Sequence, residues 1–202
     1  SKDKLFVAAV DCTGHGVPGA FMSMIGSTLL DEIIEQKKIY DTAGILEMLN
    51  ESVKEALKQE SKVNDDGMDV CLCCLEREGA GYKVLFTGAK RPLYYFNKEE
   101  NQLVTIKGDT KSIGGIQRKK RGFTQTTLHL NSGDILYLSS DGLVDQSNLD
   151  KEKFGSKRLV EMLEEIALSH LPEQERAIEG ALNTHQGNAE QRDDILLMGI
   201  QV

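Results

Sequence analysis

The sequence predicts one α+β domain in which mainly antiparallel sheets are flanked by paired helices. The order of patterns is a strand, two helices, a strand-rich middle, two helices and a last strand, unlike the strict alternation of a doubly wound parallel sheet. With 202 residues, 40% hydrophobic and 28% charged, the chain has ordinary globular composition and can bury a core. No repeat, linker or low-complexity tract divides it, so we expect a single domain over residues 1–202.

The N-terminal part begins with one strand and two amphipathic helices. The apolar run Leu5–Val10 predicts the strand, and Pro18 suits the first turn of a helix. Apolar residues every four positions extend that helix to about Lys38: Phe21, Ile25, Leu29 and Ile33. Asp41 can cap the second helix, whose apolar stripe is Ile45, Leu49, Val53 and Leu57.

The middle of the chain reads as antiparallel strands joined by turns. Strand patterns occur at Met68–Leu75, Tyr82–Phe86, Pro92–Phe96, Leu103–Ile106, Phe123–Leu130 and Asp134–Leu138. The polar segment Ser61–Gly67 and the basic, glycine-containing segment Lys107–Gly122 are predicted loops. Helical patterns return at Ser156–Ser169 and Pro172–Gln186, and the last strand is expected over Asp194–Val202.

Charge and cysteine content argue against several classes of protein. The 24 basic and 32 acidic residues give a net charge of −8, which does not suit binding to nucleic acid or to anionic lipid. Three of the four cysteines, Cys71, Cys73 and Cys74, lie in one apolar run without zinc-site spacing, so we expect reduced thiols in a reducing compartment. Runs such as Leu5–Val10 and Val70–Leu75 are too short to cross a bilayer, and we expect neither a signal peptide nor membrane contact by this domain.

Acidic residues stand beside apolar strands at three places. Asp11 follows the first strand, and Asp141 follows another strand and precedes Gly142. Asp193 and Asp194 precede the apolar strand run Ile195-Leu196-Leu197-Met198. One such Asp is most often a turn or cap residue, but the strand ends of one sheet can converge, and clustered carboxylates repel each other unless a cation joins them. Oxygen ligands of this kind suit Mg²⁺ or Mn²⁺ better than Zn²⁺.

The turn after Asp11 fits such a cation site. Gly14 and Gly16 allow the backbone to bend and to approach a metal or an anion closely. The helix that starts near Pro18 directs its free amides back toward the turn. His15 can donate a proton to a leaving oxygen, or it can simply orient the loop, and the sequence leaves both interpretations open.

Three further charged features are secondary. Asp69 can face the site, although a role at the entry of a strand is favoured. Asp145 lies four residues after Asp141 and can support the site or lie at the surface. The basic run Arg118–Arg121 can hold an anionic partner, but a solvated loop is favoured in so acidic a chain.

Over nearly the whole chain, these motifs resemble those of the metal-dependent PP2C-type (PPM) serine/threonine phosphatases, and most closely their bacterial SpoIIE/RsbU-like branch. Asp11-Cys12-Thr13-Gly14-His15-Gly16 is similar to the Asp-x-Ser-Gly-His-Gly motif of that branch, Ser140-Asp141-Gly142 to its Ser/Thr-Asp-Gly motif, and Gln191-Arg192-Asp193-Asp194-Ile195 to its closing Asp-Asp motif. Weaker matches are Asp66-Gly67-Met68-Asp69, Gly88-Ala89-Lys90-Arg91-Pro92-Leu93, and Phe154-Gly155 before Arg158-Leu159. Three motifs in the family's order and spacing are a specific signal.

The resemblance implies a PP2C-like β-sandwich with a centre for two Mn²⁺ or Mg²⁺ ions at one end. The implied metal ligands are Asp11, the backbone carbonyl of Cys12, Asp141 and Asp193, with His15 assisting the leaving group. Supporting positions near these ligands are Gly14, Gly16, Gly142 and Asp194. The implied reaction is hydrolysis of a phosphoserine or phosphothreonine ester by metal-activated water, with no covalent enzyme intermediate.

The resemblance also implies a biological setting. The expected substrate is a phosphoprotein, specifically a small anti-anti-sigma (STAS-like) regulator. The domain would be the cytoplasmic output part of a bacterial signalling protein that carries an upstream sensory domain.

The sequence departs from the family pattern at its N-terminus. The family has a further metal-binding Asp in a Gly-Asp-x-Tyr/Trp-type motif on the strand before that of Asp11, whereas this sequence opens at Ser1. We therefore expect an N-terminally truncated domain that lacks this carboxylate and one or more strands. Such a domain is expected to bind metal weakly and to turn over poorly.

Two other functions compete with the phosphatase. A catalytically weak or inactive PP2C-like module that binds a signalling partner is favoured by the missing upstream Asp. A receiver-type aspartate phosphoryl acceptor would need a parallel α/β alternation and a lysine at a strand end, which the strand-rich middle does not provide.

Overall fold

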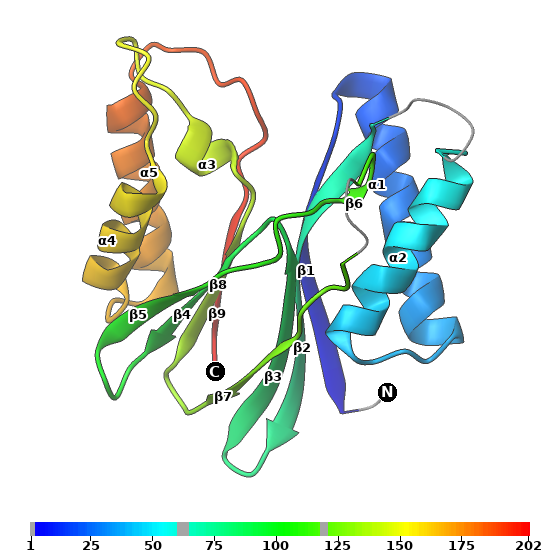
Figure 1. Ribbon diagram of the computed structural model, residues 1–202. Coiled ribbons are helices and arrows are strands. Elements are labelled where there is room, and N and C mark those ends of the chain that lie inside the picture. Colours follow the sequence, from blue (N-terminus) through cyan, green and yellow to red (C-terminus); the bar gives the residue numbers. More distant parts are fainter. Residues whose placement is uncertain (1–2, 60–64, 118–120) are drawn as a thin grey trace. The chain divides into compact units, whose positions relative to one another are not determined.

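The computed structural model describes residues 3–59, 65–117 and 121–202. It comprises two compact units, of which the first contains Ser1–Pro92 and Lys107–His129 and the second contains Leu93–Ile106 and Leu130–Val202. Each unit pairs one sheet with helices (Figure 1). The prediction of a single domain over residues 1–202 stays a prediction.

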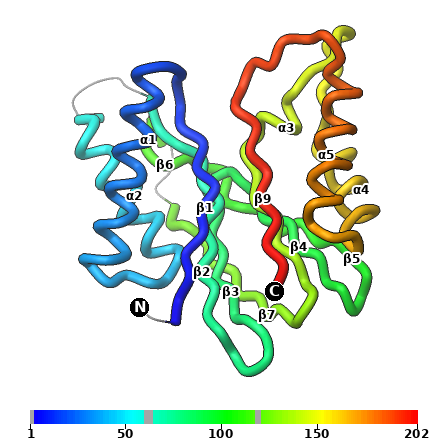
Figure 2. Tube along the Cα trace, turned by 180° about the vertical axis from the view of Figure 1, so that it is seen from behind, coloured from blue at the N-terminus to red at the C-terminus, as the bar shows by residue number. Residues whose placement is uncertain are grey.

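The first unit is built on a sheet of strand order β1-β2-β3-β7, to which the short β6 adds by pairing with β2. The pairs β1–β2, β2–β3 and β2–β6 are antiparallel, and β1 lies at the edge of the sheet (Figure 2). The bounds of these strands are β1 Lys4–Cys12, β2 Gly67–Glu78, β3 Gly81–Ala89, β6 Ile113–Gly114 and β7 Thr126–Leu130. This confirms the expected antiparallel pairing.

A layer of helices packs on one face of this sheet (Figure 1). It contains α1 (Gly16–Asp31), a π-helical turn η1 (Glu32–Gln36) and α2 (Thr42–Ala56). The carboxylate of Asp41 accepts a hydrogen bond from Gly44 N at 2.6 Å, which confirms the predicted cap of α2. Helix and sheet share one hydrophobic core that includes Met22, Ile33, Ile45, Leu46, Leu49, Val53, Met68, Val70 and Leu72.

The second unit repeats this plan with another antiparallel sheet, of strand order β5-β4-β8-β9. Its strands are β4 Leu93–Asn97, β5 Gln102–Ile106, β8 Ile135–Ser139 and β9 Leu197–Gln201. Its helices are the one-turn α3 Gly142–Asp145, α4 Ser156–Ile166 and α5 Leu171–Gln186. The core of this unit includes Tyr94, Phe96, Ile135, Tyr137, Leu143, Phe154, Leu159 and Leu163.

The α+β class with mainly antiparallel sheets and paired helices is thus confirmed, with corrections at several boundaries. The last strand begins at Leu197 rather than Asp194, because Asp194 and its neighbours form a loop that bonds to the end of β8. β7 begins at Thr126 rather than Phe123, and β3 continues to Ala89. The segment predicted as the loop Lys107–Gly122 contains the short strand β6. The predicted loop Ser61–Gly67 lies partly outside the described residues, and its last residue already belongs to β2.

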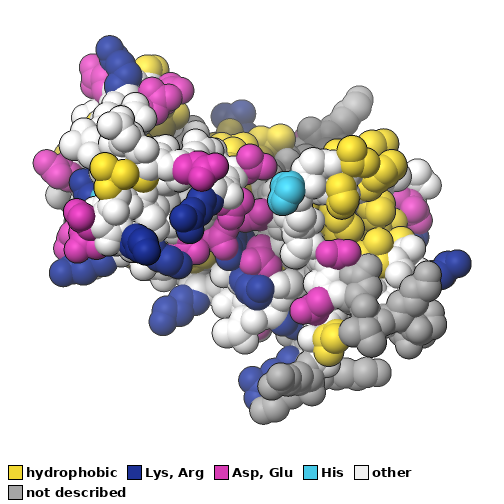
Figure 3. All heavy atoms as spheres, turned by 90° about the horizontal axis from the view of Figure 1, so that it is seen from above, with side chains coloured by type: hydrophobic (Ala, Val, Ile, Leu, Met, Phe, Trp, Pro, Cys, Tyr) yellow, Lys and Arg dark blue, Asp and Glu magenta, His cyan; other side chains and the backbone are white. Residues whose placement is uncertain are grey.

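Within the described residues, one helix is long and apolar enough by length and composition to cross a membrane. It is the continuous α1–η1 helix, Gly16–Gln36, with a mean hydropathy of 1.2 over a window that is 22% buried. One side of it packs into the core through Met22, Gly26 and Ile33. Its other side exposes Val17, Phe21 and Met24, whose exposed fractions are 69%, 60% and 65%. Figure 3 shows hydrophobic side chains gathered on one face of the molecule. The helix is apolar overall because it carries hydrophobic residues both on its buried side and on its exposed side.

A buried hydrogen bond ties α5 to the sheet of the second unit and gives a stability prediction. Tyr137 Oη donates to Gln174 Oε1 at 2.7 Å, and Gln174 is 2% exposed. Burial raises the pKa of Tyr137 to about 12, so its hydroxyl remains a donor at neutral pH. We expect Tyr137→Phe to lower the free energy of unfolding by about 1–2 kcal/mol, because it leaves a buried amide oxygen without this donor.

Urea unfolding measures this loss as a lower midpoint concentration of urea, with the m-value unchanged. Tyr82→Phe is the control, since Tyr82 lies near the start of β3 and is only half-buried. Because little buried polar surface is affected there, the control should change the free energy of unfolding by no more than about 0.5 kcal/mol. Equal losses for the two variants would contradict the prediction.

Candidate active site

The first group of predicted site residues lies where β1 ends in the first unit. Asp11 is the register partner of Asp69 on β2, so the two carboxylates project from the same face of the sheet. Thr13 extends the pairing by one residue, because its N–H donates to Gly67 O at 2.9 Å and its hydroxyl accepts from Gly67 N at 2.9 Å. The strand pair therefore holds the start of the glycine-rich turn in a fixed position.

The turn itself needs its glycines. Gly14 and Gly16 have φ values of +90° and +63°, a region that side chains disfavour. A Cβ on Gly19 would lie 2.6 Å from Gly14 O, so the first turn of α1 can lie against the motif only with glycine there. His15, between the two glycines, is exposed and has extended backbone as the N-cap of α1. The predicted bend is confirmed, whereas the role of His15 in proton transfer stays a prediction.

Asp69 is the residue that sequence reasoning undervalued. It lies inside β2 rather than at the entry of the strand, opposite Asp11. Its carboxylate accepts from Arg91 Nη2 at 2.8 Å and from Ser112 Oγ at 2.7 Å, and Lys90 Nζ lies 3.6 Å from its Oδ1. This network joins the end of β3 and the segment before β6 to the strand that faces Asp11. The sequence indicates Asp69 as a candidate but favours a role at the strand entry, because its position opposite Asp11 depends on the β1–β2 register.

The thiols of the first unit are held in their neutral form. Burial raises the pKa of Cys12, although Ser23 and its hydrogen bond act in the opposite direction. On β2, the hydrogen bond with Cys73 and burial raise the pKa of Cys71, and burial raises the pKa of Cys74. All four cysteines are free. A neutral, largely buried thiol is a poor nucleophile, which argues against thiol chemistry here.

The second group of predicted residues lies in the second unit, where β8 ends beside the segment that leads into β9. Ser140 N donates to Leu196 O at 3.1 Å, and Leu196 N donates to Ser140 Oγ at 3.0 Å. The same hydroxyl donates to Asp194 O at 3.0 Å. Asp141 and the pair Asp193-Asp194 are therefore brought to one end of this unit, as the convergence of strand ends predicted.

Gly142 makes this close approach possible. A Cβ at Gly142 would lie 2.2 Å from Asp194 O, which is backbone and cannot yield cheaply. Asp141 directly precedes α3 without a side-chain bond that caps this helix. Asp193 Oδ1 accepts from Asp194 N at 2.8 Å, and Asp193 is exposed. Asp145 is exposed as well and pairs with Lys153 Nζ at 3.0 Å, which supports its surface role.

The two groups belong to different units, each described by itself, so their meeting in one metal centre stays a prediction. In the described part of the chain no three His, Cys, Asp or Glu side chains form a metal-binding group. The basic run predicted at residues 118–121 lies outside the described residues except for Arg121.

The residues of each group nonetheless fit a hard divalent cation. Their oxygen atoms belong to carboxylates and backbone carbonyls, the ligands that Mg²⁺ and Mn²⁺ prefer. In the second unit, Asp141 and the segment of Asp193 and Asp194 are held together through Ser140, and no side chain separates Gly142 from the carbonyl of Asp194. This end of the unit is thus rich in oxygen atoms from two segments.

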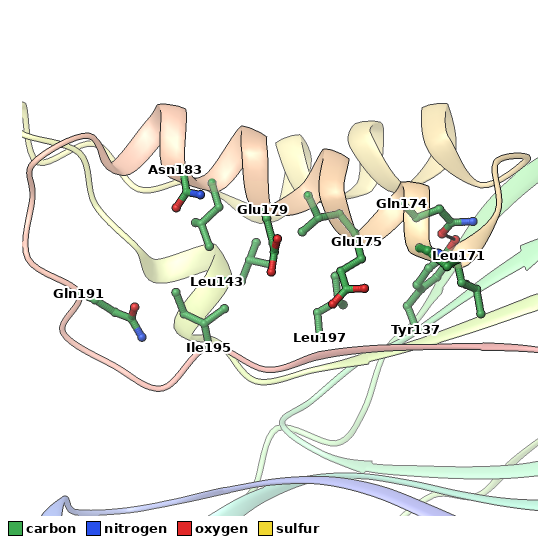
Figure 4. Close-up of a pocket in the computed structure, with 14 residues that line it drawn as sticks. Tyr137, Leu143, Leu171, Gln174, Glu175, Glu179, Asn183, Gln191, Ile195 and Leu197 are labelled. Carbon is green, nitrogen blue, oxygen red and sulfur yellow. Dashed lines mark hydrogen bonds between the residues drawn. The ribbon is translucent and has the colours of Figure 1, made fainter.

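A cavity elsewhere in the second unit does not fit an anionic substrate. It has a volume of about 660 Å³ and lies between α5 and the segment Gln191–Gly199 (Figure 4). Leu143, Ile195 and Leu197 form its apolar wall, while Glu175 and Glu179 reach it from α5. None of its described lining residues is basic, and none is a predicted site residue.

Comparison with known proteins places this arrangement in the class of PP2C-type phosphatase domains. The SiaA-PP2C domain of Pseudomonas aeruginosa is 30% identical, with a TM-score of 0.83 over 98% of this chain and 80% of that chain. The model of the family described as stage II sporulation protein E (SpoIIE) matches residues 1–202. The chain therefore belongs to the SpoIIE family. No curated protein sequence matches the chain.

Two more distant structures share the fold. The PP2C phosphatase domain of SpoIIE from Bacillus subtilis, solved with a fragment of its regulatory domain, is 18% identical with a TM-score of 0.75. The match covers 98% of this chain and 54% of that one, so the chain spans about half the length of that relative. The catalytic domain of the serine/threonine phosphatase PstP, known from Mycobacterium tuberculosis and solved with two manganese ions, is 18% identical with a TM-score of 0.58, over 95% of this chain and 85% of that one.

Proposed function

We propose that this domain hydrolyses phosphoserine or phosphothreonine on a protein substrate with two Mn²⁺ or Mg²⁺ ions. The observation that carries the proposal is the pairing of Asp141 with the Asp193-Asp194 segment through Ser140, in a chain of the SpoIIE family. Asp11, the carbonyl of Cys12, Asp141 and Asp193 would hold the ions. When bound, such ions lower the pKa of water and neutralise phosphoryl oxygens.

The residues of the chain itself would orient the substrate and handle its proton. His15 is exposed at the start of α1 and is the proposed proton donor to the leaving seryl oxygen. The free N–H groups at the first turn of α1 lie beside it and favour an anion there. Gly14 and Gly16 keep this turn open to a phosphoryl group.

The proposed setting is the cytoplasmic output part of a bacterial signalling protein with an upstream sensory domain. The proposed substrate is a small phosphorylated regulator of the anti-anti-sigma, STAS-like kind. Support comes from the family and from the SpoIIE relative, which was solved together with part of a regulatory domain.

The function is tested by turnover of a phosphoserine protein with and without Mn²⁺. We expect activity that requires the metal, is abolished by EDTA and survives alkylation of thiols. Cys12→Ser should stay within about twofold of wild type, because the backbone carbonyl is unchanged. Since the pKa values of Cys71 and Cys74 are raised, alkylation should be slow at pH 7 and should accelerate as pH rises toward those values.

If Cys12→Ser lost activity while its folding and metal affinity stayed intact, the metal mechanism would be contradicted and a thiol mechanism would be required. The alternative function is a PP2C-like module that binds a signalling partner without turnover. Stable binding of the phosphoprotein with no metal-dependent turnover would establish it.

A further inference from the structure

We propose that Lys90 is a phosphoryl-binding residue whose ammonium contacts the phosphomonoester of the substrate beside Asp11. This inference rests on the proposed function and adds a substrate contact to it. Three independent observations in the first unit carry it: the position of Lys90, its backbone conformation and the cavity that it lines.

The position of Lys90 follows from the sheet register. Asp69 is the direct cross-strand partner of Asp11, and Lys90 Nζ lies 3.6 Å from Asp69 Oδ1. Side chains at such paired positions have their Cβ atoms about 5 Å apart. The ammonium therefore lies next to the strand end that carries the predicted metal ligand.

The contact with Asp69 leaves the ammonium of Lys90 able to bind an anion. Each of its carboxylate oxygens already has a closer donor, Arg91 Nη2 at 2.8 Å and Ser112 Oγ at 2.7 Å. Lys90 makes the longest of the three contacts, and its side chain is 48% exposed, against 13% for Arg91. Arg91 thus neutralises Asp69 from a largely buried position, while Lys90 keeps donors for an incoming anion.

The backbone of Lys90 is held in one conformation at the cavity. Its φ is +59°, in the left-handed region where glycine is the favoured residue. Its conformation is fixed by backbone bonds, since Lys90 N donates to Asp109 O at 2.7 Å. Since Asp109 lines the same cavity, this bond fixes the backbone of Lys90 at the edge of that cavity.

Lys90 also lines a polar cavity of about 630 Å³ that opens beside Thr13, two residues after Asp11. Its lining carboxylates are already bonded, because Asp65 accepts from Ile116 N at 2.7 Å and Asp109 accepts from Thr124 N at 2.7 Å. Each of these two carboxylates therefore accepts a hydrogen bond from a backbone amide of the cavity wall.

The other basic residues of this cavity differ from Lys90. Lys111 is 15% exposed, pairs with Glu47 and lies 3.7 Å over the ring of Phe123, so it is fixed in place. Arg121 is exposed and directly follows the residues outside the described range. Lys90 is thus the described cation that combines exposure with proximity to Asp11.

Lys90→Gly tests the proposal, because it removes the cation and relieves the backbone at once. We expect the KM for the phosphoprotein and the inhibition constant of inorganic phosphate both to rise about tenfold, as for loss of one charge-assisted hydrogen bond. The midpoint of thermal unfolding should stay equal or rise, and Mn²⁺ affinity should not change. Lys90→Arg, which keeps the charge, should recover most of the phosphate inhibition.

Lys38→Gly is the matched control. Lys38 has a φ of +57° and lies beyond the far end of the α1–η1 helix, about 30 Å along it from the motif. Lys38→Gly should have the same effect on the midpoint of thermal unfolding, and it should leave the inhibition constant of inorganic phosphate unchanged. A phosphate inhibition constant within twofold of wild type in Lys90→Gly would overturn the proposal.

A direct titration with inorganic phosphate in Mg²⁺, followed by ³¹P NMR, separates this inference from the proposed function. A wild-type protein that binds phosphate through Lys90 but shows no turnover would overturn the phosphatase assignment and keep this site. Turnover with equal phosphate affinity in wild type and Lys90→Gly would keep the phosphatase assignment and overturn the Lys90 site.

Discussion

Asp141→Asn is expected to reduce metal-dependent phosphatase activity by at least about 100-fold while the protein stays folded. The carboxylate of Asp141 lies at the end of β8, next to the segment of Asp193 and Asp194 that Ser140 holds in place. Asparagine has almost the same shape but offers one neutral oxygen to a hard cation. Its effect on folding should be small, because asparagine keeps the size and shape of the aspartate side chain.

Two measurements separate loss of metal from loss of fold. The Mn²⁺ concentration for half-maximal activity should rise strongly, while the urea midpoint without metal should stay near that of wild type. Asp145→Asn is the matched control one turn away, since Asp145 is exposed and pairs with Lys153. It should keep wild-type activity. Normal Mn²⁺-dependent turnover in Asp141→Asn would contradict the assignment of this ligand.

The sequence was sufficient for those features that depend on local patterns. Helix α2 shows a cap at Asp41 and an apolar stripe, and both appear as predicted because neighbours along the chain determine them. The bend at Gly14 and Gly16 was predictable for the same reason, since only glycine adopts these φ values readily. The sequence predicted only that strand ends can converge, and the antiparallel pairing of β8 with β9 is what brings the loops of Asp141 and Asp193 together.

Features that depend on pairing between distant segments were not predictable. Asp69 faces Asp11 only through the β1–β2 register, and a shift of one residue would turn it to the opposite face. The short strand β6 exists because Gly67 and Met68 pair with Gly114 and Ile113, within what reads as a loop. The start of β9 at Leu197 follows from the bonds of Ser140, which no pattern around Asp194 reveals.

Gly142→Ala is expected to lower the free energy of unfolding by about 1–3 kcal/mol and to weaken Mn²⁺ binding about tenfold or more. The added Cβ would lie 2.2 Å from Asp194 O and 3.3 Å from Ile195 Cγ1. The carbonyl belongs to the backbone, so the segment that carries Asp193 must move away from Asp141. One methyl group thus acts on both proposed ligands without changing either.

Gly180→Ala is the control that isolates this clash. Gly180 lies within α5, and a Cβ there would meet nothing within 4 Å. Since alanine is the better helix former, this variant should gain about 0.5–1 kcal/mol and keep its metal affinity. Urea unfolding and Mn²⁺ titration of both variants give the comparison. If Gly142→Ala were as stable as wild type and bound Mn²⁺ equally well, the approach of the two segments would not shape the metal centre, and the ligands would have to be sought elsewhere.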